Sequence, residues 1–196
     1  MYADDDSQGR LTGVPDKNSD DLTWIYPKYV SALKTFICPA TKNYLRPPIT
    51  LTPPGGQPTV VYQDLTDNAK NPGLTNGHSY EVFGFWHSLQ YLPIPKKTLK
   101  TVSSYHHKNT VSQFGFGPDT VAGPVNTWLI LDADDPKGTG ADYDNYPDPA
   151  DNHGKDGVNV VFCDGHAEFV NQKNYLYKYE LSQDGGRSSI TPLYGP

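Results

Sequence analysis

A short stretch near the carboxyl end constrains the fold of this chain more than any other part. Val158 to Cys163 is a run of β-branched and aromatic residues, Asp164-Gly165 follows, and the chain returns through His166 to Val170. Asp-Gly between two such runs is a strong signal for a β-hairpin, because both residues of a type I′ turn take positive φ. The sequence therefore predicts a tight hairpin over 158–170 with a two-residue turn.

A two-residue turn also determines which residues of the hairpin face one another, with successive pairs alternating between its two faces. The apolar face would hold Phe162 opposite Ala167 and Val160 opposite Phe169, and the other face Cys163 opposite His166 and Val161 opposite Glu168.

The composition predicts an α+β protein with many loops. The 196 residues fit one domain and include 18 Pro and 18 Gly. Only three of the 22 acidic residues are Glu, and the remaining Asp residues favour turns and caps over helix interiors. A helical bundle is therefore excluded.

Hydrophobic spacing and turn residues predict the other elements. The pattern Tyr29/Val30, Leu33, Phe36/Ile37 predicts a regular helix over 27–36. Strands are expected at 59–63, 79–85 and 126–131, and residues 39–78 form a Pro- and Gly-rich loop excursion. The tyrosine-rich tail after Asn171 is expected to be an edge strand or a surface segment.

The net charge of −6 comes from one acidic loop, 132–157, which contains eight Asp and two Lys. Because the rest of the chain is balanced and shows no basic stripe, nucleic acid is excluded as a partner. Alternating Asp residues among glycines suit a hard cation such as calcium, which binds six to eight oxygens. The alternative is a solvated loop whose Asp side chains cap turns.

The sequence contains no apolar run of about 18 residues and no signal peptide, so no membrane-spanning segment is expected within it.

The chain resembles the pseudopilin-like proteins known as prepilin-type, processing-associated proteins with a His-(nine)-Asp-Gly motif, relatives of the type II secretion major pseudopilin. His153 precedes Asp164-Gly165 by a ten-residue spacer, one residue longer than the family's pattern. The extra residue is assigned to the loop 154–157, where added length costs little.

Three further pieces of the resemblance follow in the family's order. Residues 1–8 resemble the end of the pilin spine helix, 24–39 a second helix that runs into Cys38-Pro39, and 128–132 a strand that ends in Asp132 before the His motif.

The resemblance implies a pilin-like head, 1–196, in which a truncated N-terminal helix packs on a small antiparallel sheet of about four strands with long loops. It also implies a non-enzymatic structural subunit of a bacterial secretion or pilus filament. Its partners would be other pilin or pseudopilin subunits. An apolar helix before Tyr2, removed from this chain, would anchor it in the inner membrane, and its location would be extracytoplasmic.

The resemblance extends to the calcium loop of the major pseudopilins. Asp142 and Asp144 match the Asp-x-Asp of that loop, and Asp132 and Asp134 at the strand exit are further candidate ligands. An alternative function is an extracellular calcium-dependent module that binds a glycan or a protein. Its tryptophans, Trp24, Trp86 and Trp128, would then supply a sugar platform.

The two cysteines allow two interpretations. An even count in an extracytoplasmic protein suggests a Cys38–Cys163 disulfide, and the alternative is two buried free thiols.

No catalytic residue is assigned. Structural roles are favoured for His153 and Asp164, with Asp164 serving the turn and His153 fixing the preceding loop. A Cys163–His166 nucleophile pair would lack an orienting partner. A zinc site from Cys163, His166 and His153 would lack four ligands at the usual spacing.

Overall fold

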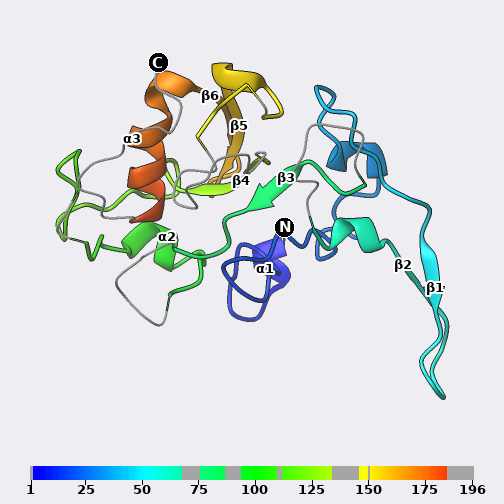
Figure 1. The fold of residues 1–196 in the computed structure, drawn as a ribbon. Helices are drawn as coiled ribbons and strands as arrows, with labels where there is room; N and C mark the ends of the chain where they lie inside the picture. The colour runs from blue at the N-terminus through cyan, green and yellow to red at the C-terminus, as the bar shows by residue number, and fades with distance from the viewer. Residues whose placement is uncertain are drawn as a thin grey trace.

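The computed structural model describes residues 2–67, 76–86, 94–109, 112–133, 146–149 and 151–184. Its centre is a four-stranded antiparallel sheet in the order β3-β4-β5-β6 (Figure 1). The strands are β3 (Tyr80–Val82), β4 (Trp128–Asp132), β5 (Gly157–Phe162) and β6 (Ala167–Asn171). The expected α+β class and the sheet of about four antiparallel strands are confirmed.

The remaining elements are short, apart from one helix. They are α1 (Tyr2–Asp5), α2 (Thr101–Ser104), α3 (Gln172–Gln183), the 3-10 turns η1 (Leu33–Phe36), η2 (Gln63–Leu65) and η3 (Gly154–Asp156), and the ribbon strands β1 (Ile49–Leu51) and β2 (Thr59–Val61). None of the helices within the described ranges has the length and apolar character needed to cross a bilayer.

The predicted hairpin is present, but its loop has three residues and its register differs by one. Val161 lies opposite Ala167, and Val160 lies opposite Glu168. The Gly165 N–H donates to the Phe162 carbonyl at 2.9 Å, and Gly165 alone takes positive φ, 92°. A tight turn followed by a left-handed glycine is the usual three-residue hairpin loop. The expected pairing of Val160 with Phe169 is therefore wrong, and Phe169 lies on the opposite face.

The tail after Asn171 is a helix rather than an edge strand or a surface segment. The Asn171 side chain accepts a hydrogen bond from the Asn174 N–H at 3.1 Å, which caps the first turn of α3. Tyr175 and Tyr179, one turn apart, place their rings 5.2 and 5.7 Å from Trp128. This packing on the sheet stabilises α3 although the tyrosine spacing also suits a strand.

The resemblance predicts that the N-terminal helix packs on the sheet, but the structure differs. Helix α1 precedes Gly9 (φ 62°), which agrees with a helix end over 1–8, but its Tyr2 ring lies 4.6 Å from Trp24 and 5.8 Å from Tyr29. The helix that covers the sheet is the C-terminal α3, as Figure 1 shows.

The expected helix over 27–36 is replaced by turns over 23–29 and by η1. The backbone at Ala32 is extended (φ −84°, ψ 102°), which separates the turns from η1, and Val30 and Leu33 on either side of it pack against the N-terminal core cluster.

A bulge in β4 distributes the core over both faces of the sheet. Trp128 lies opposite Phe162 and Ile130 opposite Val161, so β4 has one extra residue between the two pairs. Trp128 thereby joins the cluster under α3, while Ile130 packs with the N-terminal third of the chain on the other face.

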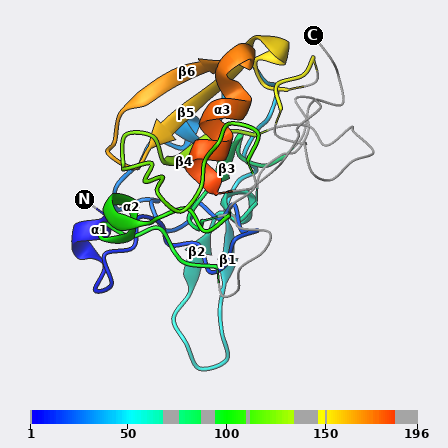
Figure 2. The same cartoon turned by 90° about the vertical axis from the view of Figure 1, so that its left-hand side faces the viewer.

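The excursion over 39–78 carries an antiparallel ribbon, β1–β2, which extends away from the rest of the molecule (Figures 1 and 2). Its apolar side chains Ile49, Leu51 and Val60 are exposed. At its base the Arg46 guanidinium donates to the buried Asp64 carboxylate at 2.5 Å. The excursion is thus anchored at its base and unsupported at its tip.

Candidate functional site

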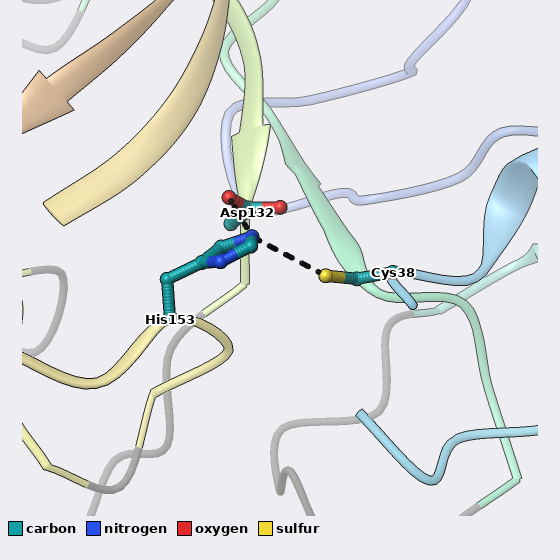
Figure 3. A group of neighbouring side chains, drawn as sticks. All are labelled: Cys38, Asp132 and His153. Carbon is teal, nitrogen blue, oxygen red and sulfur yellow. Dashed lines mark hydrogen bonds and ion pairs between the residues drawn. The ribbon is translucent and has the colours of Figure 1, made fainter. Parts of the chain in front are cut away.

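Three side chains from distant parts of the sequence meet at the face of the sheet opposite α3. Figure 3 shows Cys38, which follows η1, beside His153, which precedes η3, and Asp132 at the end of β4. Cys38 and His153 are 115 positions apart in the sequence. The sheet and the N-terminal segment together therefore build this cluster.

Cys38 and Asp132 both approach one atom of the third side chain, the Nε2 of His153. The Cys38 Sγ lies 3.4 Å from Nε2, and the Asp132 Oδ2 lies 3.3 Å from it. The Asn159 Nδ2 is also near, at 2.9 Å.

Antiparallel pairing of β4 with β5 positions the carboxylate. The Asn159 N–H donates to Asp132 Oδ2 at 2.6 Å, and the Asn159 Nδ2 donates to the same oxygen at 2.9 Å. These two bonds fix the orientation of Asp132 toward His153.

Neighbouring contacts hold the loop that carries His153. The Asn152 Nδ2 donates to the Ser79 carbonyl at 2.9 Å, which ties this loop to the start of β3. The ring of Phe169 packs edge-on against the His153 ring, with centroids 5.9 Å apart. The register of the hairpin accounts for this contact, because it places Asn159 opposite Phe169 on the site's face.

Burial sets the electrostatics of the cluster. The Cys38 residue is 2% exposed and so is Asp132, whereas the His153 side chain is 28% exposed. Burial raises the pKa of the Asp132 carboxyl, and hydrogen bonds from Asn159 oppose that rise. Burial also raises the pKa of the Cys38 thiol, with the nearby Asp132 charge acting in the same direction.

The cluster borders a cavity of about 460 Å³ between the sheet and the N-terminal segment. Ile130 and Val161 form its floor on the sheet, and apolar side chains of the N-terminal segment form the opposite wall: Leu22, Ile25, Val30 and Phe36. An apolar cavity with a few convergent polar groups is the usual form of a small-molecule site.

The geometry differs from that of a cysteine nucleophile with its base. In such a triad the carboxylate holds the ring nitrogen remote from the nucleophile. Here Asp132 and Cys38 both approach Nε2. The thiol sulfur, the imidazole nitrogen and a carboxylate oxygen instead lie within 4.8 Å of one another, close enough to be ligands of one cation.

The two ends of the His-Asp-Gly motif, His153 and Asp164, lie in different parts of the structure. Asp164 accepts a hydrogen bond from the His166 N–H at 3.1 Å and lies 2.6 Å from the His166 Nδ1. Asp164 thus serves the turn, whereas the His153 side chain lies with Cys38 and Asp132, so the structural role expected for His153 stays a prediction.

Of the two interpretations of the cysteines, the structure has the free thiols, with Cys38 buried and Cys163 partly buried. The Cys163 Sγ lies 3.8 Å from the Trp128 carbonyl, near a cluster formed by α2 and Trp86.

The one-residue change of hairpin register also removes the predicted Cys163–His166 pairing, because Cys163 now belongs to the loop. The His166 ring instead stacks on Phe162 at 4.2 Å.

The calcium prediction remains untested for most of its residues. Asp134, Asp142 and Asp144 lie outside the described residues. Asp132 is described, and its neighbours are a thiol and an imidazole, which calcium seldom uses as ligands. Cys38, Asp132 and His153 are separate pieces of one resemblance, and the sequence alone predicts different sites for them.

Comparison with protein-family models, with curated proteins and with solved structures gives no match to the chain.

Proposed function

We propose that the chain is the head of a pseudopilin-like subunit, a non-catalytic component of a bacterial secretion or pilus-type filament located outside the cytoplasm. One observation carries the proposal. The Cys-Pro element, the strand that ends in Asp132 and the His153 motif are separate pieces of the resemblance, and they meet in one cluster. Their convergence supports the interpretation that the pieces belong to one structural unit.

A filament subunit also needs surface for its neighbours, and the β1–β2 ribbon offers it. Val60 is 62% exposed and Leu51 is 48% exposed, on strands whose outer edges extend away from the body. Isolated two-stranded ribbons are marginally stable in water. A neighbouring subunit that covered this ribbon would stabilise it, so the exposed side chains favour assembly.

The test uses the full-length gene expressed in its own host. The proposal expects an apolar stretch of about 20 residues directly before Tyr2, long enough to span a bilayer. It also expects a gene product that fractionates with the inner membrane and is shortened by the prepilin peptidase. A product that lacks this stretch and remains in the cytoplasm would overturn the proposal.

Crosslinking then tests the contact surface separately. Val60→Cys in assembled material should give ladders of crosslinked subunits with a short bismaleimide. Lys173→Cys, on the exposed surface of α3, is the matched control and should give none. Ladders at Lys173 alone would refute the ribbon as the contact while leaving the membrane test to decide the function.

A further inference from the structure

We propose that Cys38, Asp132 and His153 bind a zinc-class transition-metal ion, with one coordination position open to the adjoining cavity. The proposal is independent of the filament function. It rests on distances, on the bonding capacity of one nitrogen, on ligand type and on exposure.

The spacing of the ligand atoms is the first argument. Zinc bonds to sulfur are about 2.3 Å and those to nitrogen or oxygen about 2.0–2.2 Å, so tetrahedral ligand atoms lie roughly 3.3–3.6 Å apart. The measured separations are 3.4 Å for Sγ to Nε2 and 3.3 Å for Oδ2 to Nε2. All three ligand atoms lie within 4.8 Å of one another. Two of the three separations thus match those around a tetrahedral ion, and the third, from Sγ to the carboxylate, is no more than 4.8 Å.

The bonding capacity of Nε2 is the second argument. A neutral imidazole nitrogen has either one lone pair or one N–H, so it makes one good hydrogen bond. Three polar groups nevertheless approach this atom, from Cys38, Asp132 and Asn159. An ion placed between Sγ, Oδ2 and Nε2 would bind all three ligand atoms at once. Asn159 would keep its bonds to Asp132.

The ligand types select the metal. Thiolate and imidazole favour zinc and related ions, whereas calcium and magnesium take oxygen ligands. The bonds from Asn159 to Asp132 supply the outer support that metal-binding carboxylates usually have. A zinc-class ion therefore fits this donor set better than the calcium expected for the acidic loop.

The fourth position faces the cavity. Structural zinc sites are closed by four protein ligands, whereas sites that act on small molecules have three ligands and a water. Among the described residues this cluster has three, its His153 side chain is 28% exposed, and all three residues line the apolar cavity of about 460 Å³. We expect water at the open position, replaceable by the anionic end of a small molecule with an apolar body.

The experiment measures metal content after equilibrium dialysis of the purified chain against zinc. The expected result is one equivalent per chain. Cys38→Ser, Asp132→Asn and His153→Gln should each weaken binding by at least about tenfold, because loss of an outer-shell partner alone costs about 10–100-fold. Cys163→Ser and His166→Gln are matched controls outside the cluster and should bind as the parent does. Circular dichroism checks that each variant is folded.

Cobalt(II) provides a readout that does not depend on any variant. The loaded parent should show a thiolate-to-cobalt charge-transfer band and the strong visible bands of four-coordinate cobalt. Added azide should shift the visible bands, because it replaces water at the open position. Absence of the thiolate band, zinc binding retained by Cys38→Ser, or equal loss in the Cys163→Ser control would each overturn the proposal. A visible spectrum unchanged by azide would overturn the open position.

Discussion

The β5–β6 hairpin and the β1–β2 ribbon are both antiparallel pairs joined by a glycine-containing turn, yet they differ in what covers them. Val158, Val160 and Phe162 of β5 are buried under α3, whereas the ribbon strands expose most of their apolar side chains. The loops differ in length, 163–165 against 52–58, but each holds a left-handed glycine, Gly165 at φ 92° and Gly55 at φ 72°. We therefore expect packing on neighbouring elements, rather than the glycine in the loop, to determine how much each hairpin contributes to stability.

The largest expected effect is at the start of β5. A Cβ at Gly157 would lie 2.2 Å from the Val170 carbonyl oxygen, and φ is 149°. We expect Gly157→Ala to lower the free energy of unfolding by at least about 3 kcal/mol, because backbone strain and overpacking add. Gly56→Ala, in the ribbon turn and 3.3 Å from the Pro53 side chain, should change it by less than about 0.5 kcal/mol. Urea unfolding gives both values, and an equal loss of unfolding free energy in the two variants would contradict the comparison.

The pH dependence of stability should come from the body of the molecule and not from the ribbon, because the ribbon residues 49–61 contain no titratable side chain. Burial lowers the pKa of His78 to about 4 from 6.5. The unfolded state therefore binds the proton first, and stability falls as pH drops from about 6.5 toward 4, by on the order of 3 kcal/mol.

His78→Asn isolates this effect, because its side-chain oxygen can still accept from the Tyr80 N–H as Nδ1 does at 3.4 Å. The variant should show a shallower loss of stability over this pH range in thermal melts. A parallel pH profile for parent and variant would refute the assignment to His78.

A matched pair of valines compares the strands directly. Val160 is 0% exposed in β5 and Val60 is 62% exposed in β2. Val160→Ala should cost about 2 kcal/mol, from the two lost methyl groups and the cavity they leave. Val60→Ala should cost less than about 0.5 kcal/mol. Chemical denaturation of both variants gives the two values. A large cost at Val60 would show that the ribbon contributes to the core.

The smallest expected effect concerns the two turns. Both glycines have open space around them, so only the left-handed backbone opposes a substitution. Gly165→Val should cost about 1–2 kcal/mol. Gly55→Val has the same local strain but should leave the global unfolding midpoint unchanged, because the tip can open without exposing the core. Equal shifts of the midpoint would mean that the turns, rather than the packing, distinguish the hairpins.

The sequence predicted the parts of the fold that depend on local patterns. The alternation around Asp164-Gly165 predicted the hairpin, and the apolar run before Asp132 predicted β4. The register was wrong by one residue, because Asp-Gly fits both a two-residue turn and a turn followed by a left-handed glycine. The one-residue difference in register places Phe169 on the face of the sheet where its ring contacts His153.

Tertiary packing decided the parts that the sequence did not predict. The alternating tyrosines after Asn171 suit a strand, but the Asn171 cap and the contacts of Tyr175 and Tyr179 with Trp128 stabilise a helix there. The Cys38–Asp132–His153 cluster gave no spacing signal, because its members are far apart in the chain. Their meeting depends on how the N-terminal segment folds over the sheet.

The cluster's chain positions have a mechanical consequence. Cys38 belongs to the segment that follows α1, and His153 to the loop that leads into the last hairpin. An ion that bound both residues would crosslink the chain across 115 positions. Under tension, the segment between them could then not be extended, and the protein would stretch less by that length. In a subunit pulled from its N-terminal end, resistance to extension would then rise and fall with metal supply.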